Sequence, residues 1–155
     1  MPKFPHLIAE NLNQDKLEIP SQLKGKLNVV LVAFQQWHQT LVDSWIPLLT
    51  ELMEKYSELD FYELPTIRKM NFVYRRFIDG GMRAGIRSVD TRKRTITLYI
   101  EKTPFKETLE IENEETIYVF LVDKHGEIFW RNEGAIDQEK SLSLRSTVKK
   151  LFEAS

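Results

Sequence analysis

The stretch WHQTLVD, residues 37–43, brings together side chains that could do chemistry. His38 offers an imidazole that could act as a general base, Thr40 a hydroxyl nucleophile, and Asp43 a carboxylate that could orient the base. A triad of this kind works only when the three groups lie within hydrogen-bond reach of one another. Closeness in sequence does not ensure this, so a catalytic triad is one hypothesis for the stretch.

The same stretch allows two other interpretations. In the first it is a recognition surface, in which Trp37 stacks on a partner and Asp43 or Thr40 bonds to it, with His38 and Gln39 as further candidate contact residues. In the second, Thr40 caps a following helix, Asp43 lies favourably near the positive end of that helix, and Trp37 covers the core. Both interpretations stay open at the level of sequence.

The chain of 155 residues contains no cysteine. Disulfide exchange and peroxide reduction by a thiol both need a thiolate nucleophile, so these two activities are excluded. His6, His38 and His125 are the three histidines, and none has the spacing of a metal ligand set. We therefore expect neither a metal site nor another cofactor, and we favour a protein that is not an enzyme.

A basic segment covers residues 68–94, with nine Lys and Arg opposed only by Asp79 and Asp90, which gives it a formal charge of +7. Its candidate contact residues are Arg75, Arg76, Arg83 and Arg87. Such a patch can attract an anionic partner, here an acidic or membrane-associated protein. The alternative is a solvated face balanced by the glutamates of residues 107–115. We expect no nucleic acid, because no interleaved aromatic pattern or binding motif accompanies the charges.

The first half of the chain predicts alternating strands and helices. Residues 28–34 are a continuous apolar run, which is typical of a strand buried on both faces. A helix is predicted over 40–57 from an apolar stripe with helical spacing. A short strand follows over 59–64, and Pro65 ends it. Thr66 then caps a second helix over 66–79.

The second half predicts a different arrangement. We expect a strand over 95–101, a short helix over 104–109, a hairpin of 116–123 and 124–131, and a final helix over 138–152. The predicted buried positions of that helix are Leu142, Leu144, Val148 and Leu151. Parallel strands first and an antiparallel hairpin last indicate a three-layer α/β/α domain with a mixed central sheet.

Two phrases carry a resemblance to the thioredoxin superfamily. LEIPSQLKGKLNVVLVAF resembles the sequence that leads into the active site of those proteins, and VFLVDKHGEIFWRNEG resembles their last hairpin. The resemblance implies one thioredoxin-like domain over 1–155, with its core at about 17–152. It places Gln39 and Val42 where the two cysteines of thioredoxin lie, or Asp43 where the peroxiredoxin cysteine lies.

The second half also resembles the mitochondrial family of F-type ATP synthase assembly factors, which have a thioredoxin-like domain. The matching positions are Gly80, Gly81, Arg83, Tyr118, Leu121, Asp123, Trp130 and Gly134. This resemblance implies a role in assembling the membrane sector of the synthase.

We therefore expect a non-catalytic thioredoxin-like protein that acts in protein–protein recognition or assembly. The alternatives are an enzyme of peroxiredoxin-like fold that uses chemistry other than a thiol, or a small-ligand binder at the vacated cysteine site. No basic leader precedes an apolar run, and the longest apolar run is too short to span a bilayer. We expect a cytoplasmic protein, or one of an organelle matrix if a targeting segment is removed.

Overall fold

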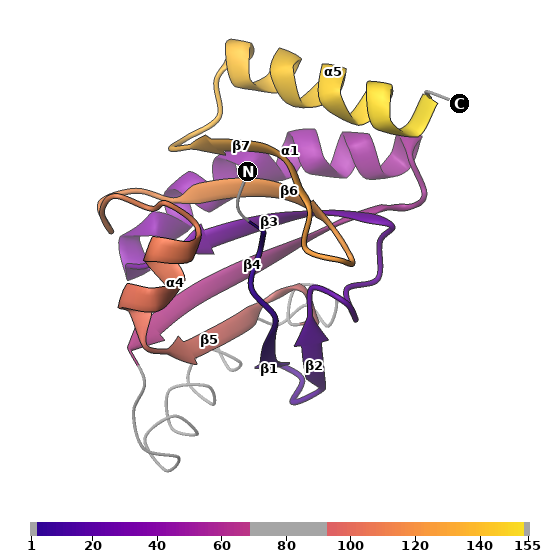
Figure 1. The fold of residues 1–155 in the computed structure, drawn as a ribbon. Coiled ribbons are helices and arrows are strands. Elements are labelled where there is room, and N and C mark those ends of the chain that lie inside the picture. The colour runs from indigo at the N-terminus through magenta and orange to yellow at the C-terminus, as the bar shows by residue number, and fades with distance from the viewer. Residues whose placement is uncertain (1–2, 69–92, 154–155) are drawn as a thin grey trace.

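The computed structural model describes residues 3–68 and 93–153. These residues form a seven-stranded sheet in the order β2-β1-β5-β4-β3-β6-β7 (Figure 1). The strands are β1 (Leu7–Asn11), β2 (Lys16–Ile19), β3 (Leu27–Ala33), β4 (Leu59–Arg68), β5 (Ile96–Ile100), β6 (Tyr118–Asp123) and β7 (Ile128–Glu133). The helices are the 3-10 turn η1 (Gln36–His38), α1 (Gln39–Lys55), α4 (Lys102–Thr108) and α5 (Gln138–Glu153).

The sheet is mixed, as the sequence predicts. Strand β4 lies parallel to both β3 and β5, whereas β6 runs antiparallel to β3 and pairs with β7 in the terminal hairpin. Residues 29–32 of β3 are fully buried, which confirms a strand covered on both faces. The three-layer α/β/α architecture predicted from sequence is therefore confirmed.

Helices α1 and α5 cover one face of the sheet, where Trp45 and Trp130 pack edge to face with ring centres 6.0 Å apart. The indole nitrogen of Trp45 also donates to the carbonyl oxygen of Gly134 at 2.9 Å. The hydrophobic effect explains this burial, since the stripe of α1 that faces the sheet is apolar.

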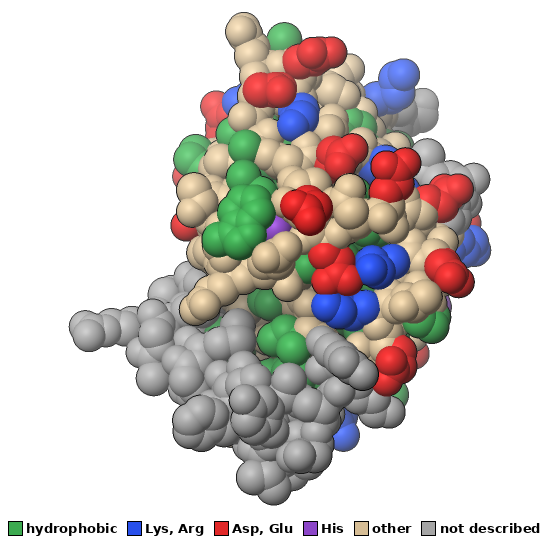
Figure 2. Space-filling model, turned by 90° about the vertical axis from the view of Figure 1, so that its left-hand side faces the viewer, with side chains coloured by type: hydrophobic (Ala, Val, Ile, Leu, Met, Phe, Trp, Pro, Cys, Tyr) green, Lys and Arg blue, Asp and Glu red, His purple; other side chains and the backbone are tan. Residues whose placement is uncertain are grey.

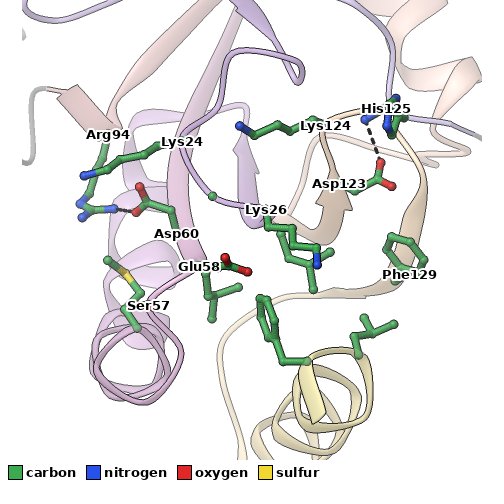
Figure 3. A pocket seen from close by; sticks show the side chains of 16 residues that line it. Lys24, Lys26, Ser57, Glu58, Asp60, Arg94, Asp123, Lys124, His125 and Phe129 are labelled. Carbon is green, nitrogen blue, oxygen red and sulfur yellow. Dashed lines mark hydrogen bonds and ion pairs between the residues drawn. The ribbon is translucent and has the colours of Figure 1, made fainter. Parts of the chain in front are cut away.

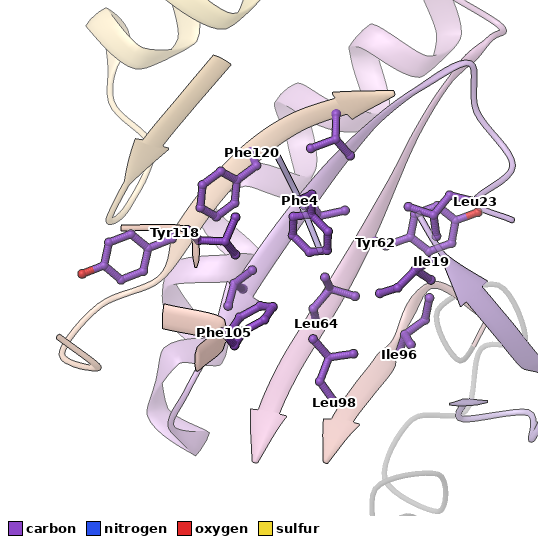
Figure 4. Close-up of a cluster of buried hydrophobic side chains, with 14 of the residues drawn as sticks. Phe4, Ile19, Leu23, Tyr62, Leu64, Ile96, Leu98, Phe105, Tyr118 and Phe120 are labelled. Carbon is purple, nitrogen blue, oxygen red and sulfur yellow. The ribbon is translucent and has the colours of Figure 1, made fainter. Parts of the chain in front are cut away.

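The other face holds a second buried cluster, in which Phe4 packs edge to face against Phe105 of α4 and Phe120 of β6 (Figure 4). The backbone nitrogen of Phe4 donates to the carbonyl oxygen of Gly126 at 2.8 Å. Gly126 has a φ of +89°, and a β-carbon there would lie 2.7 Å from the Phe4 oxygen. The β6–β7 turn therefore needs glycine at this position.

The prediction that Pro65 ends the strand and that Thr66 caps a helix is wrong. Strand β4 continues to Arg68, because its pairing passes at Pro65 from β3 to β5. Ala33 is the last partner on β3, and Leu98 pairs with Thr66. Most of the predicted helix over 66–79 lies outside the described residues.

Two further differences concern the ends of the chain. Strands β1 and β2 have no counterpart in the prediction; they form an antiparallel hairpin whose β1 pairs with β5 through Glu10 and Thr97. Leu142 of α5 was predicted to be buried but is 60% exposed. Leu144 and Val148, one helical turn apart, face the sheet instead, and a residue two positions before Leu144 falls on the opposite side.

Candidate functional site

The stretch 37–43 lies at the carboxyl end of β3, where η1 leads directly into α1. Ligands commonly bind at this end of parallel strands. Figure 2 looks at this end of the molecule, where a group of apolar side chains lies among acidic and basic ones.

Trp37 is 55% exposed, so it does not cover the core as one interpretation predicted. Its indole nitrogen donates to Oε1 of Gln35 at 3.2 Å, and Nε2 of Gln35 donates to the carbonyl oxygen of Glu114 at 2.7 Å. The Trp37 ring also packs edge to face against His38, with ring centres 4.5 Å apart. The chain thus holds a large aromatic side chain in a defined orientation while leaving half of it in solvent.

His38 is fully buried, and its side chain forms hydrogen bonds with the backbone. Its Nδ1 accepts hydrogen bonds from the amides of Phe34 and Gln35 at 3.1 and 3.2 Å. A ring nitrogen that accepts cannot carry the proton, so the neutral ring is protonated at Nε2. Nε2 faces the backbone of Glu115, although nothing in the described part of the chain makes a hydrogen bond of ordinary geometry with it.

The pKa of His38 lies below its usual value. Burial is the main cause, and it outweighs the backbone and the charge of Glu115, which raise the pKa. His38 is therefore a neutral residue that fixes the turn between β3 and α1.

The three groups of the triad hypothesis do not form a hydrogen-bonded set within the described residues. His38 is buried and bonded to the backbone, whereas Thr40 and Asp43 are exposed. The Asp43 carboxylate accepts from Nε2 of Gln39 at 2.8 Å. The proposed base, His38, and the proposed orienting carboxylate, Asp43, thus bond to other groups and not to each other. The stretch therefore lacks the chain of hydrogen bonds that a triad needs.

Thr40 does not cap α1, so the prediction that it caps the helix after β3 is wrong. The helix begins at Gln39, and the preceding residue, His38, already has helical backbone angles and makes no side-chain cap. The reason is that the chain enters α1 from the helical turn η1 and not from an extended segment. Asp43 accordingly lies in the second turn of the helix.

Gln39 occupies the position that the resemblance assigns to the first cysteine, and it joins two carboxylates. Its Nε2 donates to Asp43 and also, at 3.1 Å, to Oε1 of Glu63 in β4. Val42, at the second cysteine position, is 2% exposed and belongs to the core beneath α1. Of the two positions that the resemblance assigns to cysteines, one thus makes a polar contact and the other lies in apolar packing.

Glu63 is the residue that sequence reasoning missed. It is 9% exposed, and burial raises its pKa above the usual value; the Gln39 amide lowers the pKa, the charge of Asp43 raises it, and Arg94 lowers it. A signal was present, because a glutamate between the apolar residues Tyr62 and Leu64 of a central strand is unusual.

Among the glutamates of residues 107–115, Glu114 has local partners. Glu114 accepts from the ammonium groups of Lys102 and Lys106 at 2.6 and 2.7 Å. Burial opposes ionisation of Glu114, but these two hydrogen bonds and the two charges lower its pKa below the usual value. Arg94, at the end of the basic segment, forms an ion pair with Asp60.

The candidate residues Arg75, Arg76, Arg83 and Arg87 lie outside the described residues. Within 3–68 and 93–153, no helix is both long and apolar enough to cross a membrane. The same ranges contain no group of three His, Asp or Glu side chains placed to hold a metal ion.

Comparison with protein families gives one match, to the family described as ATP10 protein, over residues 2–151. No curated protein matches the chain. The match spans nearly the whole length and includes Gln39, Val42 and the terminal hairpin.

Solved structures show the fold independently. The thiol-disulfide oxidoreductase of Bacteroides fragilis NCTC 9343 is similar with a TM-score of 0.57 and 12% identity, covering 97% of this chain and 99% of that one. The exposed lipoprotein thioredoxin Etrx1 of Streptococcus pneumoniae TIGR4 gives 0.56 and 14%, covering 94% and 99%. BsSco, a member of the Sco family of cytochrome c oxidase assembly proteins, gives 0.56 and 11%, covering 94% and 93%. The thioredoxin-like fold predicted from sequence is therefore confirmed.

Proposed function

Because this chain belongs to the ATP10 protein family, we propose that it is a non-catalytic, thioredoxin-like assembly protein that binds another protein. Its client is a component of the F-type ATP synthase, as the family resemblance implies. The contact surface includes Trp37 at the carboxyl end of β3, with Gln39, Thr40 and Asp43 beside it.

The observation that carries this proposal is the state of Trp37. Tryptophan is among the residues that contribute most binding energy at protein interfaces. Here the indole is 55% exposed and is held through Gln35 to the backbone of Glu114, so little side-chain freedom is lost on binding. An exposed aromatic group that is already oriented is suited to anchoring a partner.

The groups around Trp37 support binding in preference to catalysis. A reactive group must be free to meet a substrate, whereas His38 and Gln39 are bonded within the chain. The complete absence of cysteine removes the chemistry of the similar oxidoreductases. BsSco supports the idea that this fold serves assembly, since it belongs to a family of assembly proteins.

A second part of the contact surface is the basic segment with Arg75, Arg76, Arg83 and Arg87. Its charge favours a client that presents acidic side chains or lies at an anionic membrane surface. The compartment that we propose is the cytoplasm or, after removal of a targeting segment, an organelle matrix, where such a client is reached from the aqueous side.

The proposal is tested by depleting the protein in its source cells and measuring assembled ATP synthase on native gels. We expect the fully assembled complex to fall and partly assembled forms to accumulate. Re-expression of the unaltered chain should restore assembly, whereas Trp37→Ala should not. Normal assembly after depletion would contradict the proposal.

A pull-down from native lysate tests the contact surface directly. We expect Trp37→Ala and the pair Arg76→Glu/Arg83→Glu each to reduce capture of synthase components severalfold. Leu142→Ala is the matched control, because Leu142 is a similarly exposed apolar residue on α5. Equal capture by all the variants would remove Trp37 and the basic segment from the contact surface.

A further inference from the structure

A cavity of about 770 Å³ lies at the opposite end of the sheet from Trp37. It is bounded by the start of β3 and β4, the β6–β7 turn and the ends of α1 and α5 (Figures 1 and 3). This volume is typical of small-molecule sites in proteins. None of the candidate residues at the carboxyl end of β3 lines it.

Three lysines from two separate segments line the cavity, namely Lys24, Lys26 and Lys124. In Figure 3 Lys124 extends from the β6–β7 turn toward the segment that carries Lys24 and Lys26. None of the three makes an ion pair with another described residue, whereas Arg94 in the same wall is paired with Asp60. The lining carries four Lys and Arg against Glu58, Asp60 and Asp123, so its formal charge is +1 with His125 neutral.

The backbone that carries these lysines is fixed by hydrogen bonds. Asn28 is fully buried; its Oδ1 accepts from the Gly25 amide at 3.0 Å, and its Nδ2 donates to the Gly25 carbonyl at 2.9 Å. The amide of Lys24 donates to the Tyr62 hydroxyl, and that of Lys26 to the Glu58 carbonyl. Lys24 and Lys26 therefore leave a rigid turn on either side of Gly25.

The turn that carries Lys124 is fixed in the same way. Oδ1 of Asp123 accepts from the amides of His125 and Glu127 at 2.9 and 3.0 Å. This use of Asp123 holds its carboxylate against the turn. The cations are thus presented from two prepared segments, which reduces the entropy lost when a ligand binds.

The remaining wall is apolar. Its members come from β3, β4, β7 and the two helices, and include Leu27, Leu59, Met53, Phe129, Leu151 and Phe152. Leu27 and Leu59 are nearly buried, and Phe129 is 41% exposed. A small inorganic anion would leave this surface in contact with water, and an uncharged hydrocarbon would leave the lysines without a counterion.

From this combination we infer that the cavity binds a single-chain anionic amphiphile. Its carboxylate or phosphate head pairs with Lys26 and Lys124, and its hydrocarbon tail covers the apolar wall. The inference does not depend on the assembly role, since it concerns the other end of the molecule.

The test uses the full chain and four probes, with the three amphiphiles kept below their critical micelle concentrations. Binding is measured by calorimetry and by NMR amide shifts. Laurate and dodecyl phosphate are the anionic probes, dodecyl maltoside carries the same tail without charge, and inorganic phosphate supplies a head alone. We expect saturable one-to-one binding of at least one anionic probe, with shifts confined to the segments around the cavity. Comparing laurate with dodecyl phosphate distinguishes a carboxylate head from a phosphate head.

The variant Lys26→Glu/Lys124→Glu should bind the preferred probe at least about tenfold more weakly. The control Lys16→Glu/Lys149→Glu makes the same change in net charge at exposed positions that do not line the cavity, and it should bind within about twofold of the unaltered chain. Phe129→Ser should weaken binding of the amphiphile while leaving the circular dichroism spectrum and the melting temperature of the protein unchanged. The inference is overturned if dodecyl maltoside or inorganic phosphate binds as tightly as the preferred anionic probe, if the lysine pair has no effect, or if the shifts fall elsewhere.

Discussion

The two ends of strand β3 show opposite uses of polar side chains. Beyond its carboxyl end, His38 bonds to the backbone and Gln39 bonds to Glu63 of the neighbouring strand β4, while the Trp37 ring stays half exposed. At its amino end, the Asn28 side chain bonds to the backbone of Gly25 and fixes a turn, and that turn carries lysines that line a cavity. A buried polar residue thus organises each end, but we propose that one end contacts another protein and that the other binds a small molecule.

Replacing His38 by alanine should have the largest effect on stability. It removes the acceptor of two backbone amides and leaves space in a fully buried position. We expect the free energy of unfolding to fall by about 3 kcal/mol, measured by urea denaturation. The control His125→Ala, at an exposed position by the other end, should change it by less than about 0.5 kcal/mol. If the two substitutions lowered the free energy of unfolding equally, His38 would not have the proposed role in fixing the turn.

Replacing Asn28 by alanine should be the next largest change. The Gly25 amide and carbonyl lose their partners, which should cost about 2 kcal/mol. The matched control is Asn132→Ala in β7, whose side chain accepts only from the neighbouring Glu133 amide. If Asn28 organises the cavity, its variant should also bind the amphiphile probe more weakly than Asn132→Ala does.

Glu63→Gln should raise stability in a way that depends on pH. Because burial raises the pKa of Glu63 in the folded chain, its contribution is fully present below the unfolded value and is lost as the pH rises through the folded value. Glutamine keeps the acceptor for Gln39 without a charge. We expect little difference at pH 4 and a gain of about 1 kcal/mol at pH 8. A gain of the same size at both pH values would show that ionisation of Glu63 is not its cause.

Trp37→Ala should have the smallest effect on stability, below about 0.5 kcal/mol, because the ring is half in solvent. Thermal melting would measure this. A small change in melting together with a large loss of client capture would separate binding from folding. A large loss of stability would instead assign Trp37 to the packing of the turn, as the sequence allowed.

Local patterns predicted much of this fold. The apolar run of β3, the stripe of α1 and the β6–β7 hairpin each carry their own periodicity or turn residues, and each was found within a few positions. The second part of β4 was not predictable in this way, since it exists because β5 provides partners beyond Pro65. Strands β1 and β2 are short; β1 depends likewise on pairing with β5, and β2 pairs with β1.

The candidate site was predictable in position but not in role. Sequence placed Trp37, His38, Gln39, Thr40 and Asp43 together at the end of β3, and the structure does so. It could not show that His38 turns inward to the backbone, nor that Gln39 reaches Glu63 on another strand. Both contacts depend on how the chain folds in space, and so does the position of Lys26 and Lys124 around one cavity.

The burial of Val42 bears on whether redox activity could be introduced into this chain. A cysteine introduced there would be enclosed by hydrocarbon, where a thiol keeps its proton and reacts slowly. A second one in place of Gln39 would in addition leave Glu63 without its amide donor. Two substitutions would thus supply the motif, but the second cysteine would lie within the packing beneath α1 and would need repacking there to react.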